Sequence, residues 1–502
     1  MENQPGNEIH KGNQFKKILV HGSWYLVSSV LTKVSQILLL PVYTRYIDPT
    51  EYGVLQSLYS ILRFLPIVIS FYLDSSFARY YYMDRVISRE KVTELYSTHF
   101  WFVLGWGILM TLGLWIISPF TVQPLLKIPF LPFIPIISTV ALLNQLVLMG
   151  TIQLKAELKA KKVILIEIVA LLLNIGLTLY LLIFQKMGIK ANLFGLLLAS
   201  IASIIYFMRI ASQNAFLKFV FKFSVLVRSL KFSIPLIPNI AAGWISNLSD
   251  RLILAFYGEM EQVGLYSLSA QIALMLYLIN DAMTQVQGPI GMSAFTEDPK
   301  KAKVQMSEFI SFYVWVMFFA YLGLTFFSKE VLYILTAPSY HSAYRLVAIL
   351  AFMYVVSGLY RVFTVVLAYH EKTWVISSAA IVAAIVNLIL NFSLIPIFGQ
   401  WAAAWSSLFS MFSYTCWITY WAQKIDKIDI QFGVVAPAVF VGLVLLAIQQ
   451  TIEYKFSIGF GSGILLKVGM MSIYVFTFLI IPSTRTPKKM ILLKIKNKLK
   501  WS

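Results

Sequence analysis

Several charged residues fall inside long apolar stretches of the sequence, among them Lys33, Arg63, Asp281 and Arg361. A charge at the centre of a membrane helix costs about 2.5–3.5 kcal/mol on insertion scales, so such residues usually face a wet cavity or a partner. The three cations fit either ligand binding or ion pairing, and Lys33 has Asp281 as one available partner. Asp281 fits either an ion-coupling carboxylate or one half of a structural salt bridge.

Polar residues at helical spacing accompany these charges. They form two stripes, Tyr25-Ser29-Lys33-Gln36 and Asn239-Gly243-Asn247-Asp250. Spacing of three or four residues places each stripe on one helix face. Ser29, Gln36, Asn239 and Asn247 are therefore predicted to line a polar cavity. Asp250 and its neighbour Arg251 are predicted to lie near a helix end, paired with each other or anchored at the interface.

The composition is that of a membrane protein. Hydrophobic residues make up 59% of the 502 positions and charged residues 13%, whereas a soluble domain has about 45–50% and about 25%. A single cysteine, Cys416, excludes a disulfide framework, and the five histidines lack zinc-ligand spacing. The sequence contains no Gly-x-x-x-x-Gly-Lys-Ser/Thr motif for ATP. We therefore predict neither a metal nor a cofactor.

Apolar runs of about 20 residues, the length that crosses a bilayer, predict an all-α polytopic fold of about fourteen spans. These lie near 18–43, 52–72, 98–118, 130–152, 163–184, 191–208, 231–255, 262–288, 308–328, 343–368, 374–396, 400–421, 432–449 and 463–481. The short pair at 191–208 and 432–449 is the weakest part of this prediction, which leaves twelve or thirteen spans open.

The basic residues predict an orientation. With a cytoplasmic N-terminus, 29 of the 41 Lys and Arg residues fall in inside segments and 6 in outside loops. This bias follows the positive-inside rule, so we predict a multi-pass plasma-membrane protein with both termini cytoplasmic. The same bias explains the net charge of +19, because basic residues on the cytoplasmic side set the topology and attract anionic lipid. Binding to nucleic acid is therefore not needed to explain this charge.

An offset near 211 residues suggests an internal repeat. Gly53 matches Gly264, Ser28 and Gln36 match Asn239 and Asn247, and Asn174 matches Asn387 at an offset of 213. Both copies start on the same predicted side, so the repeat is parallel, an architecture known in transporters. The predicted organisation is a cytoplasmic tail (1–17), a first six-helix lobe (18–208), a cytoplasmic linker (209–230), a second six-helix lobe (231–421), two further spans (422–481) and a basic cytoplasmic tail (482–502).

Three stretches carry a family resemblance. They are Pro41-Val42-Tyr43-Thr44-Arg45-Tyr46-Ile47-Asp48-Pro49-Thr50-Glu51-Tyr52-Gly53, then the segment from Leu230-Lys231-Phe232-Ser233-Ile234-Pro235 through Asn247-Leu248-Ser249-Asp250-Arg251 to Val263-Gly264-Leu265-Tyr266-Ser267, and Asn387-Leu388-Ile389-Leu390-Asn391 through Gly399. From about residue 15 to about residue 480, the chain resembles the polysaccharide flippase branch of the multidrug/oligosaccharidyl-lipid/polysaccharide exporter superfamily.

This resemblance implies a non-enzymatic transporter in the bacterial inner membrane. Its expected cargo is an undecaprenyl-diphosphate-linked oligosaccharide, flipped by alternating access for export of a surface polysaccharide such as lipopolysaccharide O-antigen or capsule. Lys33, Arg63 and Arg361 then become candidate phosphate ligands, and Asp281 a candidate site for H+ or Na+ coupling. Expected partners are membrane lipids and polymerase or glycosyltransferase proteins of the same pathway.

Two other functions remain open. A drug/cation antiporter of the same fold would favour acidic cavity residues over Lys33 and Arg63. A membrane polysaccharide polymerase, which is an enzyme, would need a catalytic outer loop, and the longest predicted outer loop has only about 15 residues. A scaffold without transport activity fits poorly with buried charges and a repeat.

Overall fold

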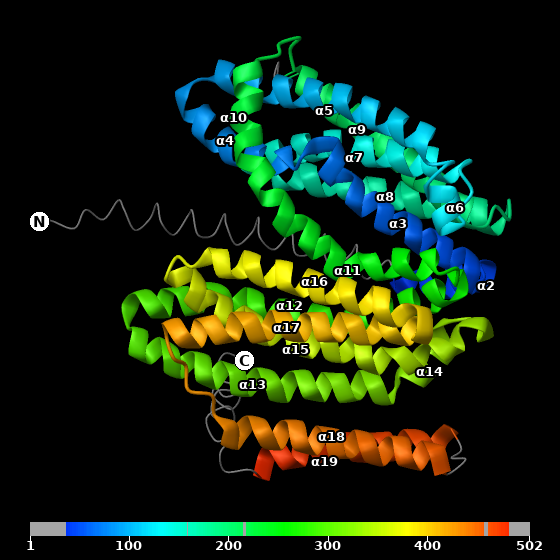
Figure 1. The fold of residues 1–502 in the computed structure, drawn as a ribbon, viewed down its shortest axis with the longest axis vertical. Helices are drawn as coiled ribbons and strands as arrows, with labels where there is room; N and C mark the ends of the chain where they lie inside the picture. The colour runs from blue at the N-terminus through cyan, green and yellow to red at the C-terminus, as the bar shows by residue number, and fades with distance from the viewer. Residues whose placement is uncertain (1–36, 158, 214–216, 456–459, 481–502) are drawn as a thin grey trace, which may run out of the picture. The chain divides into compact units, whose positions relative to one another are not determined.

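The computed structural model describes residues 37–157, 159–213, 217–455 and 460–480, and within these ranges the chain is helical, without a β-strand (Figure 1). The helices are α2 (Leu40–Tyr46), α3 (Pro49–Ser70), α4 (Leu73–Ile87), α5 (Arg89–Ile117), α6 (Val122–Leu126), α7 (Phe133–Ala156), α8 (Ala160–Ile183), α9 (Ile189–Gln213), α10 (Phe223–Ser233), η1 (Ile234–Leu236), α11 (Ile237–Phe256), α12 (Met260–Glu297), α13 (Pro299–Phe326), α14 (Ser328–Leu335), η2 (Pro338–Ala343), α15 (Tyr344–Tyr369), α16 (Thr373–Phe398), α17 (Gln400–Ile425), α18 (Phe432–Lys455) and α19 (Phe460–Ile480).

Among the described residues, 12 helical stretches are long and apolar enough to cross a membrane. They coincide with twelve of the predicted spans, including the short pair, which the structure extends to Ile189–Ala211 and Phe432–Glu453. α17 has 26 residues, enough to cross, but its Ser, Tyr and Trp content makes it less apolar. Most of the first predicted span lies outside the described residues. The predicted all-α polytopic fold is confirmed.

Local sequence explains where the span helices begin. Asp48 accepts a hydrogen bond from the backbone N–H of Glu51 at 2.8 Å, and Pro49 occupies the first helical turn of α3. Ser88 caps α5 through Lys91 N–H, and Asp298 caps α13 through the N–H groups of Lys300 and Lys301. A side-chain oxygen at the N-cap satisfies amide groups that have no partner within the helix, so these positions fix the helix starts.

The helix starts repeat along the chain. α3, α5, α7, α8 and α9 begin 210 to 213 residues before α12, α13, α15, α16 and α17, respectively. The turns that precede α9 and α17 also match, because Gly188 and Gly399 both have positive φ, of 55° and 54°. The copies differ at one point: α3 and α4 are separated by Phe71 and Tyr72 in the left-handed region, whereas α12 runs on as one helix of 38 residues.

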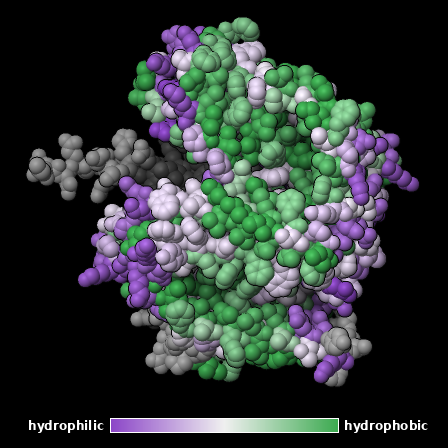
Figure 2. Space-filling model, in the orientation of Figure 1, coloured by the Kyte–Doolittle hydropathy of each residue, from purple (hydrophilic) through white to green (hydrophobic). Residues whose placement is uncertain are grey.

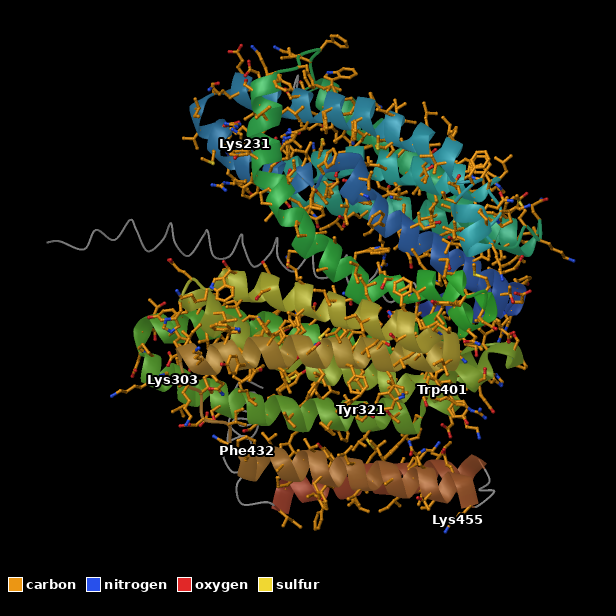
Figure 3. All side chains as sticks on the ribbon, in the orientation of Figure 1. Lys231, Lys303, Tyr321, Trp401, Phe432 and Lys455 are labelled. Atoms are coloured by element: carbon orange, nitrogen blue, oxygen red, sulfur yellow. The ribbon has the colours of Figure 1, made fainter. Side chains whose placement is uncertain are left out.

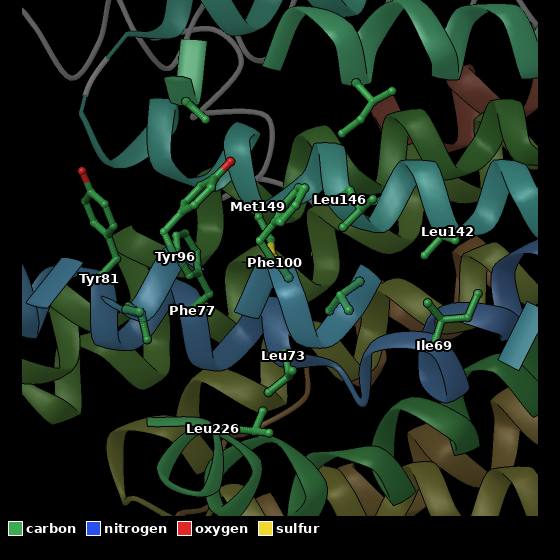
Figure 4. Packing of buried hydrophobic residues seen from close by; sticks show 14 of the residues in the cluster. Ile69, Leu73, Phe77, Tyr81, Tyr96, Phe100, Leu142, Leu146, Met149 and Leu226 are labelled. Atoms are coloured by element: carbon green, nitrogen blue, oxygen red, sulfur yellow. The ribbon is translucent and has the colours of Figure 1, made fainter. Parts of the chain in front are cut away.

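The chain divides into two compact units, each described here by itself. Unit 1 comprises residues 1–244 and 255–264, and unit 2 comprises residues 245–254 and 265–502. In unit 1, α7 packs against α3, α5 and α9, and α8 packs against α9. Its main core is formed by α3, α4, α5 and α7, with Leu73, Phe77 and Leu95 fully buried (Figure 4).

Unit 2 is built around α13, α15 and α17. α15 packs against α13 and α17, α16 against α17, and the hairpin of α18 and α19 against α13 (Figure 1). Lys467 of α19 fastens this hairpin, because its ammonium lies 2.6 Å from a Glu330 oxygen and 3.1 Å from a Glu453 oxygen. The Lys467 side chain is only 4% exposed. A buried cation with two carboxylates is compensated, as burial requires.

The surface is that of a protein embedded in lipid. Apolar residues cover the flanks of the helices, and hydrophilic residues gather near the helix ends (Figure 2). In unit 2, Lys303, predicted inside, and Lys455, predicted outside, lie at opposite ends of the helices (Figure 3). That separation is the geometry that spans crossing a bilayer require.

Candidate functional site

Arg361 and Asp281 form an ion pair between two spans of unit 2. The Arg361 Nη1 atom lies 3.3 Å from Asp281 Oδ1 and donates to Thr284 Oγ1 at 3.1 Å. Their side chains are 27% and 21% exposed, so the pair is neither sealed in the core nor fully solvated. Of the two interpretations left open for each residue, an interhelical ion pair is therefore present in this structure.

The guanidinium also has capacity for a further ligand. Its carbon lies 5.7 Å from the centre of the Tyr277 ring and 6.0 Å from that of the Tyr360 ring. The buried Nε atom has no hydrogen-bond partner among the described residues. A guanidinium carries five N–H donors, and planar recognition of phosphate or carboxylate uses two at once. Arg361 can therefore bind an anion in addition to Asp281 or in exchange for it.

Asp250 is the centre of a second polar cluster in unit 2. The residue is 1% exposed, and its carboxylate accepts hydrogen bonds from Asn391 Nδ2 at 2.6 Å, Ser407 Oγ at 2.5 Å and the Tyr266 hydroxyl at 2.7 Å. Asn391 Nδ2 also donates to Asn387 Oδ1 at 3.0 Å. Four helices, α11, α12, α16 and α17, thus meet at one buried carboxylate.

This cluster supplies several oxygen atoms at close range. Asn391 Oδ1 is buried without a hydrogen-bond partner among the described residues. The Nδ2 atom of the same amide donates to oxygens of both Asp250 and Asn387, and Ser407 Oγ donates to the other Asp250 oxygen. Carboxylate, amide and hydroxyl oxygens are the ligands that hard cations prefer. No group of three or more His, Cys, Asp or Glu side chains suited to a metal occurs in the described part of the chain.

Asp250 and Arg251 bind different partners. Arg251 Nε donates to Ser267 Oγ at 3.1 Å, and its Nη1 donates to the Asn247 carbonyl at 3.1 Å. The carboxylate of Asp250 turns into the cluster described above. Of the two predicted alternatives, direct pairing of these neighbours is absent from the interactions of the described residues, because consecutive helical residues point about 100° apart. Anchoring at the interface stays a prediction.

The second polar stripe forms an open face of α11. Asn239 and Asn247 are both exposed, and a Cβ atom added to Gly243 between them would meet no atom within 4 Å. Arg63, on α3 of unit 1, is also exposed. Lys33, Ser29 and Gln36 lie outside the described residues. Because Arg63 and Arg361 belong to different units, each is described within its own unit only.

Sequence reasoning missed most of the Asp250 cluster. Tyr266 and Asn391 lie in the motif stretches and Ser407 lies in an apolar run, and the sequence alone predicts none of them as a site residue. The available signal was Asn387 and Asn391 at helical spacing within an otherwise apolar run. Two amides on one face of a membrane helix need a polar partner, which could have been sought on the neighbouring spans.

At the end of α7, beyond the span, Glu157 joins α7 to α4 of unit 1. Its carboxylate accepts hydrogen bonds from the Tyr81 hydroxyl and from Gln153 Nε2, both at 3.0 Å, and lies 2.5 Å from Lys159 Nζ. Burial acts to raise the pKa of Glu157, but the bonds from Lys159, Gln153 and Tyr81 outweigh it and hold this pKa below its ordinary value. Nearby, Arg228 of α10 binds both oxygens of Asp84, at 3.2 and 2.6 Å.

The fold defines a class: an all-α multi-pass membrane protein. A solved structure of the lipid II flippase MurJ, in an inward closed conformation, has a TM-score of 0.71 and 15% identity, with 92% of this chain and 98% of that chain covered. An inward-facing multidrug resistance MATE family transporter of the MOP superfamily has a TM-score of 0.65 and 11% identity, covering 77% and 93%. At these identities the likeness concerns the fold.

The family follows from the sequence itself. The family model described as "Polysaccharide biosynthesis protein" matches residues 42–345, more than half of the 502 residues, and the chain belongs to that family. No curated protein sequence matches the chain. The family match and the shared fold confirm the resemblance drawn from the three motif stretches.

Proposed function

We propose that this protein flips a polyprenyl-diphosphate-linked oligosaccharide across the bacterial plasma membrane for export of a surface polysaccharide. Membership of a polysaccharide biosynthesis family supports the pathway, and a fold shared with a lipid II flippase supports the transport step. The observation that carries the proposal is Arg361. It is a cation inside a membrane span and forms an ion pair with Asp281. Its buried Nε–H group has no hydrogen-bond partner among the described residues.

The mechanism is alternating access. The diphosphate docks against Lys33, Arg63 and Arg361 from the cytoplasmic side, while the sugars enter the polar interior and the prenyl tail stays in lipid. Unlike charges attract more strongly in a partly desolvated site than in water. Recognition therefore rests on the phosphates, and the open face of Asn239, Gly243 and Asn247 leaves room for different sugars. Relaxed sugar specificity follows.

Coupling to an ion is part of the proposal. A diphosphate that takes Arg361 would release Asp281, whose freed carboxylate could then take up H+ or Na+. Binding of the diphosphate to Arg361 and of the ion to Asp281 would then favour the same conformation of the protein. Coupled transport requires such a shared preference. Asp250 is a second candidate, because its carboxylate is more deeply buried and is surrounded by amide and hydroxyl groups.

The proposed orientation places both chain ends in the cytoplasm. It rests on the distribution of Lys and Arg, which favours the same side loop after loop. In this orientation the start of α13 near Lys303 faces the cytoplasm and the end of α18 at Lys455 faces outward. Cysteine labelling at each end with a reagent that does not cross membranes would test the assignment.

The proposed function can be tested in a strain whose surface polymer depends on this protein. Arg361→Ala should reduce surface polymer and cause lipid-linked oligosaccharide to accumulate on the inner leaflet, at unchanged protein abundance. Arg361→Lys should restore part of the export, since it returns a positive charge without the planar donor pair. Normal export by Arg361→Ala would remove Arg361 from the phosphate site.

A drug/cation antiporter is the second candidate, favoured by the buried Asp250 cluster and by the MATE-like fold. The two functions differ in what accumulates when the protein is lost. Loss of a flippase leaves lipid-linked oligosaccharide on the inner leaflet. Loss of an antiporter leaves polymer synthesis intact and makes the cells more sensitive to drugs.

A further inference from the structure

A short strap in unit 1 has a composition suited to a membrane surface. It comprises residues 217–223, Leu217-Lys218-Phe219-Val220-Phe221-Lys222-Phe223, and ends at the first residue of α10. The side chains of Phe219, Phe221 and Phe223 are 91%, 50% and 70% exposed, and Lys218 and Lys222 between them are exposed as well. Exposed phenylalanines favour apolar surroundings, and the lysines between them favour anionic groups.

The strap is firmly attached to α5. The backbone N–H groups of Lys218 and Lys222 donate to the hydroxyl groups of Ser97 and Thr98, at 3.0 and 3.1 Å. Ser97 and Thr98 are fully buried beneath it. Trp101 Nε1 donates to the Lys218 carbonyl at 2.9 Å. The exposed phenylalanines are therefore presented by a fixed backbone, which lowers the entropy lost when they bind.

The attachment point lies at the depth where α5 enters the bilayer. α5 has 29 residues and ends at Ile117. A hydrocarbon core of about 30 Å corresponds to about 20 helical residues at about 1.5 Å each. Counting back from Ile117 by that number reaches Ser97 and Thr98, and no charged residue lies between Glu94 and Ile117. The strap therefore lies level with the boundary between hydrocarbon and headgroups.

We propose that the strap is an interfacial lipid-binding site, in which Phe219, Phe221 and Phe223 insert at the headgroup boundary and Lys218 and Lys222 bind anionic phospholipid headgroups. Interfacial aromatic residues and nearby lysines are the two features that recruit anionic lipid. Lys222 lies 3.5 Å from a Glu94 oxygen but keeps a half-exposed side chain, so it can still reach a phosphate.

Its depth and its attachment to a membrane span distinguish this site from a protein-docking surface. At the level where α5 enters the bilayer, the exposed side chains of the strap face lipid, and the strap follows α5 closely through Ser97, Thr98 and Trp101. The site binds by headgroup charge and not by sugar, so it is separate from the proposed transport site.

Fluorescence quenching tests where the strap lies. The full-length protein with Cys416→Ala and Phe221→Cys carries one thiol for an environment-sensitive fluorophore. After reconstitution into vesicles of phosphatidylcholine with phosphatidylglycerol, a nitroxide placed near the lipid headgroup should quench the label strongly, and aqueous iodide weakly. Strong iodide quenching would overturn the proposal. A label shielded from both quenchers would also overturn it, because protein would then cover the strap.

Thermal-shift titration with a short-chain phosphatidylglycerol tests the charges in detergent. Lys218→Gln and Lys222→Gln should each weaken the apparent affinity about five-fold, the equivalent of about 1 kcal/mol per lysine. The matched control is Lys300→Gln with Lys301→Gln, two exposed lysines at the start of α13. Equal weakening in the control pair and the strap variants would contradict a lipid site at the strap, provided that all variants melt alike without lipid.

Discussion

Gly53 of α3 and Gly264 of α12 are in direct backbone contact, and they are the two residues that the 211-residue offset equates. A Cβ atom added to Gly53 would lie 2.0 Å from the Met260 carbonyl oxygen, and one added to Gly264 would lie 2.0 Å from the Pro49 carbonyl oxygen. Met260 and Pro49 are separated by the same offset. These reciprocal contacts join equivalent residues of the 211-residue repeat, and all four residues belong to unit 1.

Side chains at this crossing should destabilise the protein. Gly53→Ala and Gly264→Ala should each lower the free energy of unfolding by about 1–3 kcal/mol, the usual cost of overpacking. Thermal unfolding in detergent measures the change. Gly105→Ala and Gly113→Ala are the controls, because an added Cβ meets nothing within 4 Å there and should stabilise the helix slightly. Equal melting temperatures for all four variants would contradict a close crossing.

The Asp281–Arg361 pair should behave as more than a structural salt bridge. Arg361→Ala should reduce export on the order of ten- to a hundred-fold, as expected for loss of charged hydrogen bonds. If the pair were only structural, the double variant Asp281→Ala/Arg361→Ala would recover export by removing the uncompensated carboxylate. We expect no recovery, and a double-mutant cycle on export rate and melting temperature separates the two cases.

The Asp250 cluster should contribute to stability through its hydroxyl donors. Tyr266→Phe removes a donor 2.7 Å from a buried carboxylate oxygen and should cost about 1–3 kcal/mol. Tyr474→Phe is the matched control, since that buried hydroxyl makes only a 3.4 Å bond to the Trp315 carbonyl. A larger loss for Tyr474→Phe would argue against a tightly bonded cluster.

Ion coupling should depend on one of the two carboxylates. With purified protein in vesicles, Asp250→Asn and Asp281→Asn can be compared for the dependence of flipping on an imposed H+ or Na+ gradient. The coupling residue is the one whose replacement abolishes the dependence while leaving downhill flipping measurable. Unchanged gradient dependence in both variants would exclude both residues.

Glu157 should stabilise the protein only above acidic pH. Its pKa in the folded state lies below the ordinary value of 4.5. Its contribution is therefore complete above that ordinary value and is lost as the pH falls through the lower folded-state pKa. Glu157→Gln should lower the melting temperature at pH 7, and the difference from the wild type should shrink well below pH 4.5. A difference that grows on acidification would contradict the assigned sign.

Much of the fold was predictable because membrane spans carry a strong one-dimensional signal. Length and hydropathy located the twelve apolar stretches, and equivalent glycines revealed the repeat. Helix ends were less predictable, since α5 begins in a polar turn capped by Ser88, and α12 extends well beyond its apolar core to Glu297. The break at Phe71 and Tyr72 gave no signal, because neither residue type favours the left-handed conformation that both adopt.

The candidate site was only partly predictable. Single charges within apolar runs predict Arg361 and Asp281 as candidates, but their contact is not predicted, since Lys33 is the available partner predicted for Asp281 and no partner is predicted for Arg361. Which side chains surround Asp250 depends on four helices that are distant in sequence, so Tyr266, Asn391 and Ser407 could be grouped only by the fold. The predicted roles of Lys33, Ser29 and Gln36 remain predictions.

The most direct test of the central claim measures where lipid-linked oligosaccharide resides when this protein is absent. Cells depleted of the protein should retain polyprenyl-diphosphate-linked oligosaccharide on the inner leaflet and lose surface polymer. Wild-type protein should reverse both effects, whereas protein carrying Lys33→Ala or Arg361→Ala should reverse neither. Unchanged precursor and polymer in depleted cells would contradict the flippase assignment itself.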